Sequence, residues 1–229
     1  SPVNLSSSNL LAIEDMTKSE ISSLLDRADY FANLDRHSDV KNLSGYVMLN
    51  VFFENSTRTR VSFELAARRL GAEVINISLT NSSIKKGESL LDTASTLNAM
   101  KPDFLIVRHP HSGAPRLFAD YLDCSIINAG DGRHEHPTQA LLDALTIRRR
   151  LGYLKGLKIS ICGDIANSRV ARSNIHLLTI MGAEVRCIAP PTLMPSNLEK
   201  LGVKCYYYMK IRIKDADVIM LLRLQNERM

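Results

Sequence analysis

Short apolar runs and longer amphipathic stretches follow one another in a regular order along this chain. Residues 46–53 form an apolar run rich in β-branched and aromatic side chains after Gly45, which is typical of a buried strand. Residues 59–70 then place apolar side chains at helical spacing, and Gly71 follows as a stop signal. The alternation recurs, so it predicts an α/β fold with parallel sheets covered by helices.

The remaining elements are expected from the same two periodicities. A capping box, Thr17 with Glu20, opens a first helix that ends at about residue 34. Pro137 suits the first turn of a long helix. The further expected strands are 73–79, 103–108, 125–129, 156–163, 184–189, 203–207 and 217–222, and the further expected helices are 88–100, 114–122, 137–151 and 169–181.

The cycle of strands and helices restarts after the long helix, which indicates two doubly wound domains. We place the boundary near Gly152, so that residues 1–152 form one domain and residues 153–229 the other, with helix 137–151 joining them. No helix follows the last expected strand to cover its sheet. We therefore expect the second domain to be incomplete at its carboxyl end.

Composition and charge exclude several classes of protein. The chain has 229 residues, of which 45% are hydrophobic and 23% charged, as in soluble globular proteins. No apolar stretch approaches the roughly 18 residues that span a bilayer. The net charge is +5, but the basic residues form no tract, which favours small anionic substrates over nucleic acid. We expect neither a membrane nor a nucleic-acid partner.

The cysteines indicate a reducing compartment. Cys124, Cys162, Cys187 and Cys205 stand far apart, without a C-x-x-C pair. Metal sites and redox pairs usually show close spacing, so we expect free, largely buried thiols. The cytoplasm is the expected location.

The most informative polar cluster, Ser56-Thr-Arg-Thr-Arg60, lies where the first strand ends and its helix begins. Free backbone N–H groups and the positive end of the helix dipole gather at such a position. Hydroxyl groups and arginine forks suit phosphate oxygens. The motif therefore predicts an anion site, although a capped helix with solvated arginines would show the same residues.

Further polar residues follow other expected strands. Arg108 ends strand 103–108, and His136 and Gln139 flank the start of the long helix. A neutral imidazole there can donate to a carbonyl oxygen and stabilise charge that develops on it. His134 and His136 also suggest metal ligands, but no third ligand has suitable spacing, so we expect no metal and no cofactor.

Two other turns carry candidate binding groups. The polar loop 80–87 holds two lysines, and Arg223 and Gln225 follow the last expected strand. Residues 163–169 form a strand-to-helix turn, yet they lack both G-x-G-x-x-G and the P-loop spacing. A dinucleotide-binding protein is therefore a weak alternative.

Taken together, these motifs resemble the carbamoyltransferases. The residues that carry the resemblance are Ser56 to Arg60, Lys86 to Glu88 with Asp92 and Thr93, and His136 to Gln139. Lys86-Gly87, Asn167-Ser-Arg169 and Arg223-Leu-Gln225 resemble the catalytic chain of aspartate carbamoyltransferases in particular. The resemblance extends over essentially the whole chain, in order.

This resemblance implies carbamoyl transfer from carbamoyl phosphate to L-aspartate, a step of pyrimidine biosynthesis. The residues that would bind carbamoyl phosphate are Ser56, Thr57, Arg58, Thr59, Arg108, His136 and Gln139. Within this set, the catalytic residues would be Arg58, Thr59, Arg108 and His136. The residues that would bind aspartate are Lys86, Arg169, Arg223 and Gln225.

The resemblance also implies a homotrimer with shared active sites. Lys86, with Ser82 or Ser83, would reach in from the neighbouring subunit. A regulatory subunit or a larger assembly is a further partner that the family suggests. Two alternatives stay open: an ornithine carbamoyltransferase, which typically has cysteine in place of Thr138, and a non-catalytic subunit that serves assembly.

Overall fold

The computed structural model describes residues 3–79, 89–208 and 213–223. The chain divides into two compact units, which we name by their strands. The β1–β4 unit contains Leu5–Leu11 and Ala32–Pro137. The β5–β8 unit contains Ser1–Asn4, Ala12–Phe31 and Thr138–Met229.

The β1–β4 unit is built on a four-stranded sheet with the order β2-β1-β3-β4. Its strands are β1 (Val47–Phe52), β2 (Glu73–Ser78), β3 (Phe104–His109) and β4 (Ser125–Asp131). Every pairing in the sheet is parallel, for example Val51 opposite Val107. The carboxyl ends of the strands therefore meet at one edge, where ligands bind in open α/β sheets.

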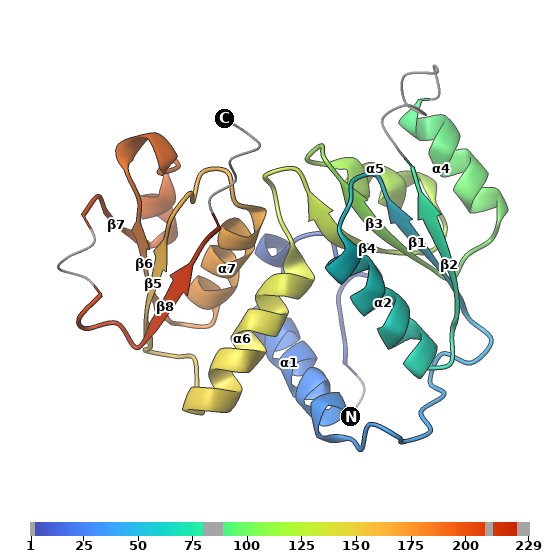
Figure 1. Ribbon diagram of the computed structural model, residues 1–229, viewed down its shortest axis with the longest axis horizontal. Helices are drawn as coiled ribbons and strands as arrows, with labels where there is room; N and C mark the ends of the chain where they lie inside the picture. Colours follow the sequence, from blue (N-terminus) through green and yellow to red (C-terminus); the bar gives the residue numbers. More distant parts are fainter. Residues whose placement is uncertain (1–2, 80–88, 209–212, 224–229) are drawn as a thin grey trace. The chain divides into compact units, whose positions relative to one another are not determined.

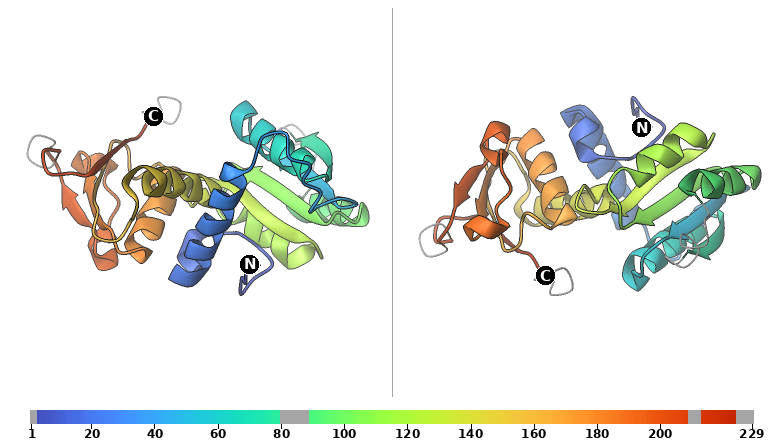
Figure 2. Two further views of the ribbon diagram at one scale, coloured as in Figure 1. Left: turned by 90° about the horizontal axis from the view of Figure 1, so that it is seen from below. Right: turned by 90° about the horizontal axis from the view of Figure 1, so that it is seen from above.

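Helices cover both faces of this sheet (Figures 1 and 2). Helix α2 (Thr57–Arg69) packs on one face through Ala67, against Met48, Phe52 and Ile106. Helices α4 (Leu90–Ala99) and α5 (Ala114–Tyr121) pack on the other face, against the side chains that alternate with these. Because neighbouring strand residues point to opposite faces, the apolar run 46–53 supplies both cores.

The β5–β8 unit has a second parallel sheet, with the order β7-β6-β5-β8. Its strands are β5 (Lys158–Cys162), β6 (Glu184–Ile188), β7 (Lys204–Tyr206) and β8 (Val218–Leu221). Helices α1 (Lys18–Asn33), α6 (Pro137–Leu151) and α7 (Arg169–Ile180) share one hydrophobic core with it. The described part of the unit also contains the 3-10 turns η1 (Ile13–Asp15), η2 (Pro191–Leu193) and η3 (Leu198–Leu201).

Ion pairs join α6 to α1 within this unit. Arg148 Nη1 lies 2.9 Å from Asp26 Oδ1, and Arg149 Nη1 lies 3.1 Å from Asp29 Oδ1. The arginine run at the end of α6 thus pairs with carboxylates besides lying at the negative end of the helix dipole. The Asp partners are exposed or half-exposed, so each pair contributes about 1 kcal/mol at most.

The predicted α/β class with two parallel sheets is confirmed. The capping box is also confirmed, since the Glu20 N–H donates to Thr17 Oγ1 and the Thr17 N–H donates to Glu20 Oε1. The domain boundary near Gly152 stays a prediction. The compact units divide instead at Pro137, because α6 shares its core with α1 and α7.

The cysteines are free thiols, as expected. Cys162 and Cys187 are buried on β5 and β6. Burial raises the pKa of the Cys187 thiol to about 12, so this thiol stays protonated at neutral pH. Among the described residues, none of the helices has the length and apolar character that crossing a membrane requires.

Candidate functional site

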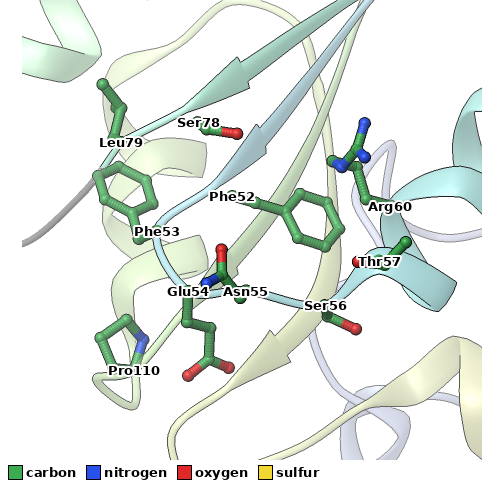
Figure 3. Close-up of a pocket in the computed structure, with 10 residues that line it drawn as sticks. All are labelled: Phe52, Phe53, Glu54, Asn55, Ser56, Thr57, Arg60, Ser78, Leu79 and Pro110. Atoms are coloured by element: carbon green, nitrogen blue, oxygen red, sulfur yellow. The ribbon is translucent and has the colours of Figure 1, made fainter.

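A pocket of about 450 Å³ opens at the carboxyl ends of β1 and β2 (Figure 3). Residues 52–57 form one part of its lining, and Arg60, Ser78, Leu79 and Pro110 form the rest. The pocket lies at the edge of the sheet where the parallel arrangement predicts a ligand site. Ser56 and Thr57, both predicted phosphate ligands, line it directly.

The start of α2 provides the donors of this pocket. Ser56 is the N-cap residue, and its side chain makes no capping hydrogen bond. The first turn of α2 contains no acidic residue. The N–H groups of this turn are therefore available as donors, and they lie at the positive end of the helix dipole. Both features attract an anion.

Arg108 is held beside this turn by three groups. Its Nε donates to Glu54 Oε1 over 3.0 Å, and its Nη1 lies 3.1 Å from the Ala129 carbonyl oxygen and 3.4 Å from Thr59 Oγ1. The Arg108 side chain is only 14% exposed. The structure thus brings together Arg108 and Thr59, which are both among the predicted catalytic residues. It adds Glu54, which is not among the predicted site residues.

Arg58 occupies a different environment. It is exposed on the first turn of α2, and it is not among the residues that line the pocket. Arg60 lines the pocket instead, with its Nη1 3.9 Å from Glu64 Oε2. The predicted role of Arg58 in binding phosphate therefore stays a prediction.

The loop before His136 is fixed by a buried carboxylate. Asp131 accepts hydrogen bonds from Asn128 Nδ2 (2.8 Å) and from the N–H groups of Gly113 (2.9 Å) and Glu135 (3.1 Å). His134 Nδ1 lies 3.0 Å from Asp131 Oδ2. Burial by itself raises the pKa of the Asp131 carboxyl, but the His134, Gly113 and Asn128 hydrogen bonds outweigh it and lower the pKa overall.

A second contact joins this loop to the turn after β3. Gly132 has φ +53°, and a Cβ atom there would lie 2.6 Å from Ser112 Oγ and 2.8 Å from Ser112 N. Only glycine fits this approach. His109, the last residue of β3, is also buried, and its Nδ1 accepts the His111 N–H over 2.9 Å. Burial lowers the pKa of His109 to about 4, so its imidazole is neutral at pH 7.

His136 itself is buried, with 5% of its surface exposed, and it directly precedes α6. Gln139 lies in the first turn of α6, where its Nε2 donates to Asp143 Oδ1 over 3.0 Å. Asp143 is a second residue that the motifs do not single out. The signal that would find it is its i+4 spacing from Gln139 on a helix.

Two predicted aspartate ligands follow neighbouring strands of the β5–β8 unit. Arg169 begins α7 after β5, and Arg223 follows β8. These strands pair in parallel, and the Leu222 N–H continues the pairing by donating to the Cys162 carbonyl over 2.9 Å. Both arginines therefore come after carboxyl ends at the same edge of this sheet.

The turn before Arg169 is held by local hydrogen bonds. Asp164 Oδ1 accepts from the Asn167 N–H (3.2 Å) and from Asn167 Nδ2 (2.9 Å). Ser168 caps α7 by accepting from the Ala171 N–H over 3.0 Å. These bonds fix the point at which Arg169 leaves the backbone. Lys86, Ser82, Ser83 and Gln225 lie outside the described residues, and their predicted roles stay predictions.

Comparison with known proteins agrees with this arrangement. A family model described as aspartate/ornithine carbamoyltransferase, carbamoyl-P binding domain, matches residues 8–149. The aspartate carbamoyltransferase catalytic subunit of Rhodospirillum centenum is 60% identical over 96% of this chain and 70% of its own length. The corresponding subunit of Ruegeria pomeroyi is 59% identical over 96% of this chain and 72% of its own length.

Solved structures give the same result. Aspartate transcarbamoylase from Trypanosoma cruzi, in complex with carbamoyl phosphate and aspartate, is 34% identical with a TM-score of 0.87, over 95% of this chain and 73% of that one. The catalytic subunit of M. jannaschii aspartate transcarbamoylase is 38% identical with a TM-score of 0.83, over 97% of this chain and 76% of that one. These matches show that the chain belongs to the aspartate carbamoyltransferase family.

Proposed function

We propose that this chain transfers the carbamoyl group of carbamoyl phosphate to the α-amino group of L-aspartate. The products are N-carbamoyl-L-aspartate and phosphate, and the reaction belongs to pyrimidine biosynthesis. The observation that carries the proposal is Arg108 held against Thr59 at the start of α2, beside a pocket that Ser56 and Thr57 line. Family membership and the names of the relatives support it.

In this proposal, the phosphate of the donor binds at the N-terminal end of α2. Ser56, Thr57 and Thr59 supply hydroxyl groups, the first turn supplies N–H groups, and Arg58 supplies charge. Arg108, Thr59 and His136 donate to the carbamoyl oxygen. The amine of aspartate attacks the carbamoyl carbon, and negative charge develops on that oxygen. The C–O bond to phosphate then breaks, and the departing phosphate takes up the proton that the amine loses.

Catalysis then rests on orientation and on donors that are positioned before the reaction. Two substrates held at the correct distance gain effective concentration, and donors aimed at the developing oxyanion stabilise the transition state. The contacts of Arg108 with Glu54 and with the Ala129 carbonyl support this role, because they fix its guanidinium. No side-chain nucleophile is required.

The aspartate substrate carries two carboxylates, and Arg169 and Arg223 offer two matching forks. Lys86 and Gln225 complete the proposed set of aspartate ligands. The position of Arg169 and Arg223 after neighbouring parallel strands supports their joint role. An ornithine substrate would instead present a cationic side chain to these two cations, which is unfavourable.

We further propose a cytoplasmic homotrimer with shared active sites, to which a regulatory subunit or a larger assembly would bind. Exposed apolar side chains on the β1–β4 unit support self-association: Val61 and Leu65 on α2, Ile75 on β2 and Leu91 on α4. The free thiols support a reducing compartment.

A competition assay tests the proposed function. The chain is incubated with carbamoyl phosphate and an equimolar mixture of aspartate and ornithine, and the two carbamoylated products are separated and quantified. We expect N-carbamoyl-L-aspartate to dominate. Faster formation of citrulline would assign the chain to the ornithine branch of the family, and formation of neither product would indicate a non-catalytic subunit.

A further inference from the structure

A hydrogen-bonded chain of three side chains links α6 to α7 within the β5–β8 unit. Gln139 Nε2 donates to Asp143 Oδ1 over 3.0 Å, and Asn174 Nδ2 donates to Asp143 Oδ2 over 3.0 Å. Asn174 Nδ2 also donates to the Val170 carbonyl over 3.0 Å. Asp143 thus receives one donor on each carboxylate oxygen.

The hydrogen bond to the Asp143 carboxylate fixes the orientation of the Gln139 amide. An ionised carboxylate only accepts hydrogen bonds, so the amide must turn its NH₂ group towards Asp143. The group that Gln139 can offer elsewhere is then Oε1, which is an acceptor. Without the carboxylate, the two orientations of the amide would differ little in energy.

Asn174 keeps the Asp143 carboxylate in place at a cost. Its amide is 1% exposed, and its Oδ1 has no hydrogen-bond partner among the described residues. A buried acceptor without a partner typically costs about 1–3 kcal/mol. Turning the amide over would satisfy neither Asp143 nor the Val170 carbonyl, because both are acceptors. The arrangement therefore serves the carboxylate.

We propose that Asp143 is a positioning residue that makes Gln139 an acceptor for the carbamoyl amino group. This inference rests on the proposed function, and within it we assign Gln139, one of the predicted ligands of carbamoyl phosphate, to the carbamoyl amino group. The carbamoyl NH₂ is a donor, so it requires Oε1 and is rejected by Nε2. Asp143 thereby acts on the choice of acyl donor, without touching the substrate, and it favours an acyl group that carries NH₂.

The test compares two acyl phosphates in the Asp143→Asn variant of the full chain. Carbamoyl phosphate has NH₂ where acetyl phosphate has a methyl group, and the two share the carbonyl and phosphate groups. An asparagine offers one acceptor and one donor to two incoming NH₂ groups, so Gln139 loses its fixed orientation. We expect affinity for carbamoyl phosphate to fall about tenfold, as for one lost hydrogen bond.

Binding of acetyl phosphate distinguishes the positioning role from a merely structural one, because a structural defect would weaken the binding of both acyl phosphates. We expect its affinity to change less than about twofold in Asp143→Asn, since the methyl group makes no hydrogen bond. Asn174→Ala removes the hydrogen bond to the other carboxylate oxygen of Asp143. We expect it to lower the affinity for carbamoyl phosphate as well, but by less than Asp143→Asn does. Asp120→Asn, at an exposed position on α5, is the matched control and should alter neither affinity.

Equal weakening of both acyl phosphates in Asp143→Asn, or no weakening of either, would overturn the positioning role. Thermal unfolding of each variant shows whether it folds. If Asp143→Asn does not fold, the two acyl phosphates are compared in Asn174→Ala instead. Failure of the proposed function has a different signature. In that case the unmodified chain itself would not bind carbamoyl phosphate.

Discussion

Arg108 and Glu54 form a close ion pair at the carboxyl end of the β1–β4 sheet, with Nε 3.0 Å from Oε1 and the two side chains 14% and 22% exposed. The arginine that we assign to the carbamoyl oxygen therefore has a carboxylate partner inside the protein. This pairing fixes the guanidinium, and it also offsets positive charge where an anion is to bind.

Replacement of Glu54 by glutamine should strengthen the binding of inorganic phosphate. Glutamine Oε1 can still accept from Arg108, but the negative charge is lost. We expect phosphate to bind about fivefold more tightly, on the order of 1 kcal/mol, as measured by titration calorimetry at low ionic strength. Glu73→Gln, at the exposed start of β2, should have no such effect. Unchanged or weaker phosphate binding by Glu54→Gln would show that the charge of Glu54 does not act on the anion site.

Replacement of Arg58 by alanine should lower kcat strongly and leave stability almost unchanged. Arg58 is exposed on the first turn of α2, so its removal leaves no cavity. A positioned cation that stabilises a leaving phosphate contributes about 3 kcal/mol or more, which corresponds to a hundredfold loss of rate. Arg69→Ala, exposed near the end of the same helix, is the control for general charge. A folded Arg58→Ala variant with near-normal kcat would show that Arg58 is a solvated helix residue.

The fold follows from the sequence because its signals are local. Pro137 and the basic run 148–150 mark both ends of α6 correctly, and Thr17 with Glu20 marks the start of α1. Helix α2 begins two residues before its predicted start at Thr59, because Thr57 and Arg58 are polar and exposed and add nothing to the apolar periodicity.

The supporting residues of the site could not be predicted in this way. Glu54 and Arg108 lie 54 positions apart, and their contact depends on the order of strands in the sheet. Asp131 likewise fixes its loop through the distant Gly113. The motifs predict which side chains carry charge and hydroxyl groups. They contain no information on which carboxylate orients them.

Acidification should destabilise the protein partly through His109. Burial lowers the pKa of His109 to about 4 from its ordinary 6.5, with further effects from the neighbouring His111, Glu54 and Asp131. The unfolded chain therefore binds this proton first as the pH falls. The contribution of His109 is complete above about pH 6.5 and is lost towards pH 4, by about 3 kcal/mol in total.

Denaturant unfolding across this pH range measures the effect in matched variants. His109→Gln keeps an acceptor for the His111 N–H but does not titrate, so we expect its stability to depend less on pH between 6.5 and 4. His37→Gln removes an exposed imidazole and should follow the unmodified protein. Identical slopes for His109→Gln and the unmodified protein would mean that His109 titrates normally.

The proposed sharing of active sites can be tested by mixing two inactive variants. Arg58→Ala and Lys86→Ala proteins are dissociated and reassembled together. If Lys86 acts across an interface, some sites combine an intact Arg58 from one subunit with an intact Lys86 from another, and we expect activity to return. If verified mixed assemblies stay inactive, Lys86 does not act in trans.

The most direct test of carbamoyl transfer follows the new bond itself. Carbamoyl phosphate labelled with ¹³C is incubated with ¹⁵N-labelled L-aspartate and the chain, and the ¹³C resonance is recorded by NMR. Our account predicts a carbamoyl signal split by one-bond coupling to ¹⁵N, together with stoichiometric phosphate, and a loss of both in Arg108→Ala. A ¹³C signal without this splitting, with carbamoyl phosphate decaying at the rate seen without protein, would contradict it.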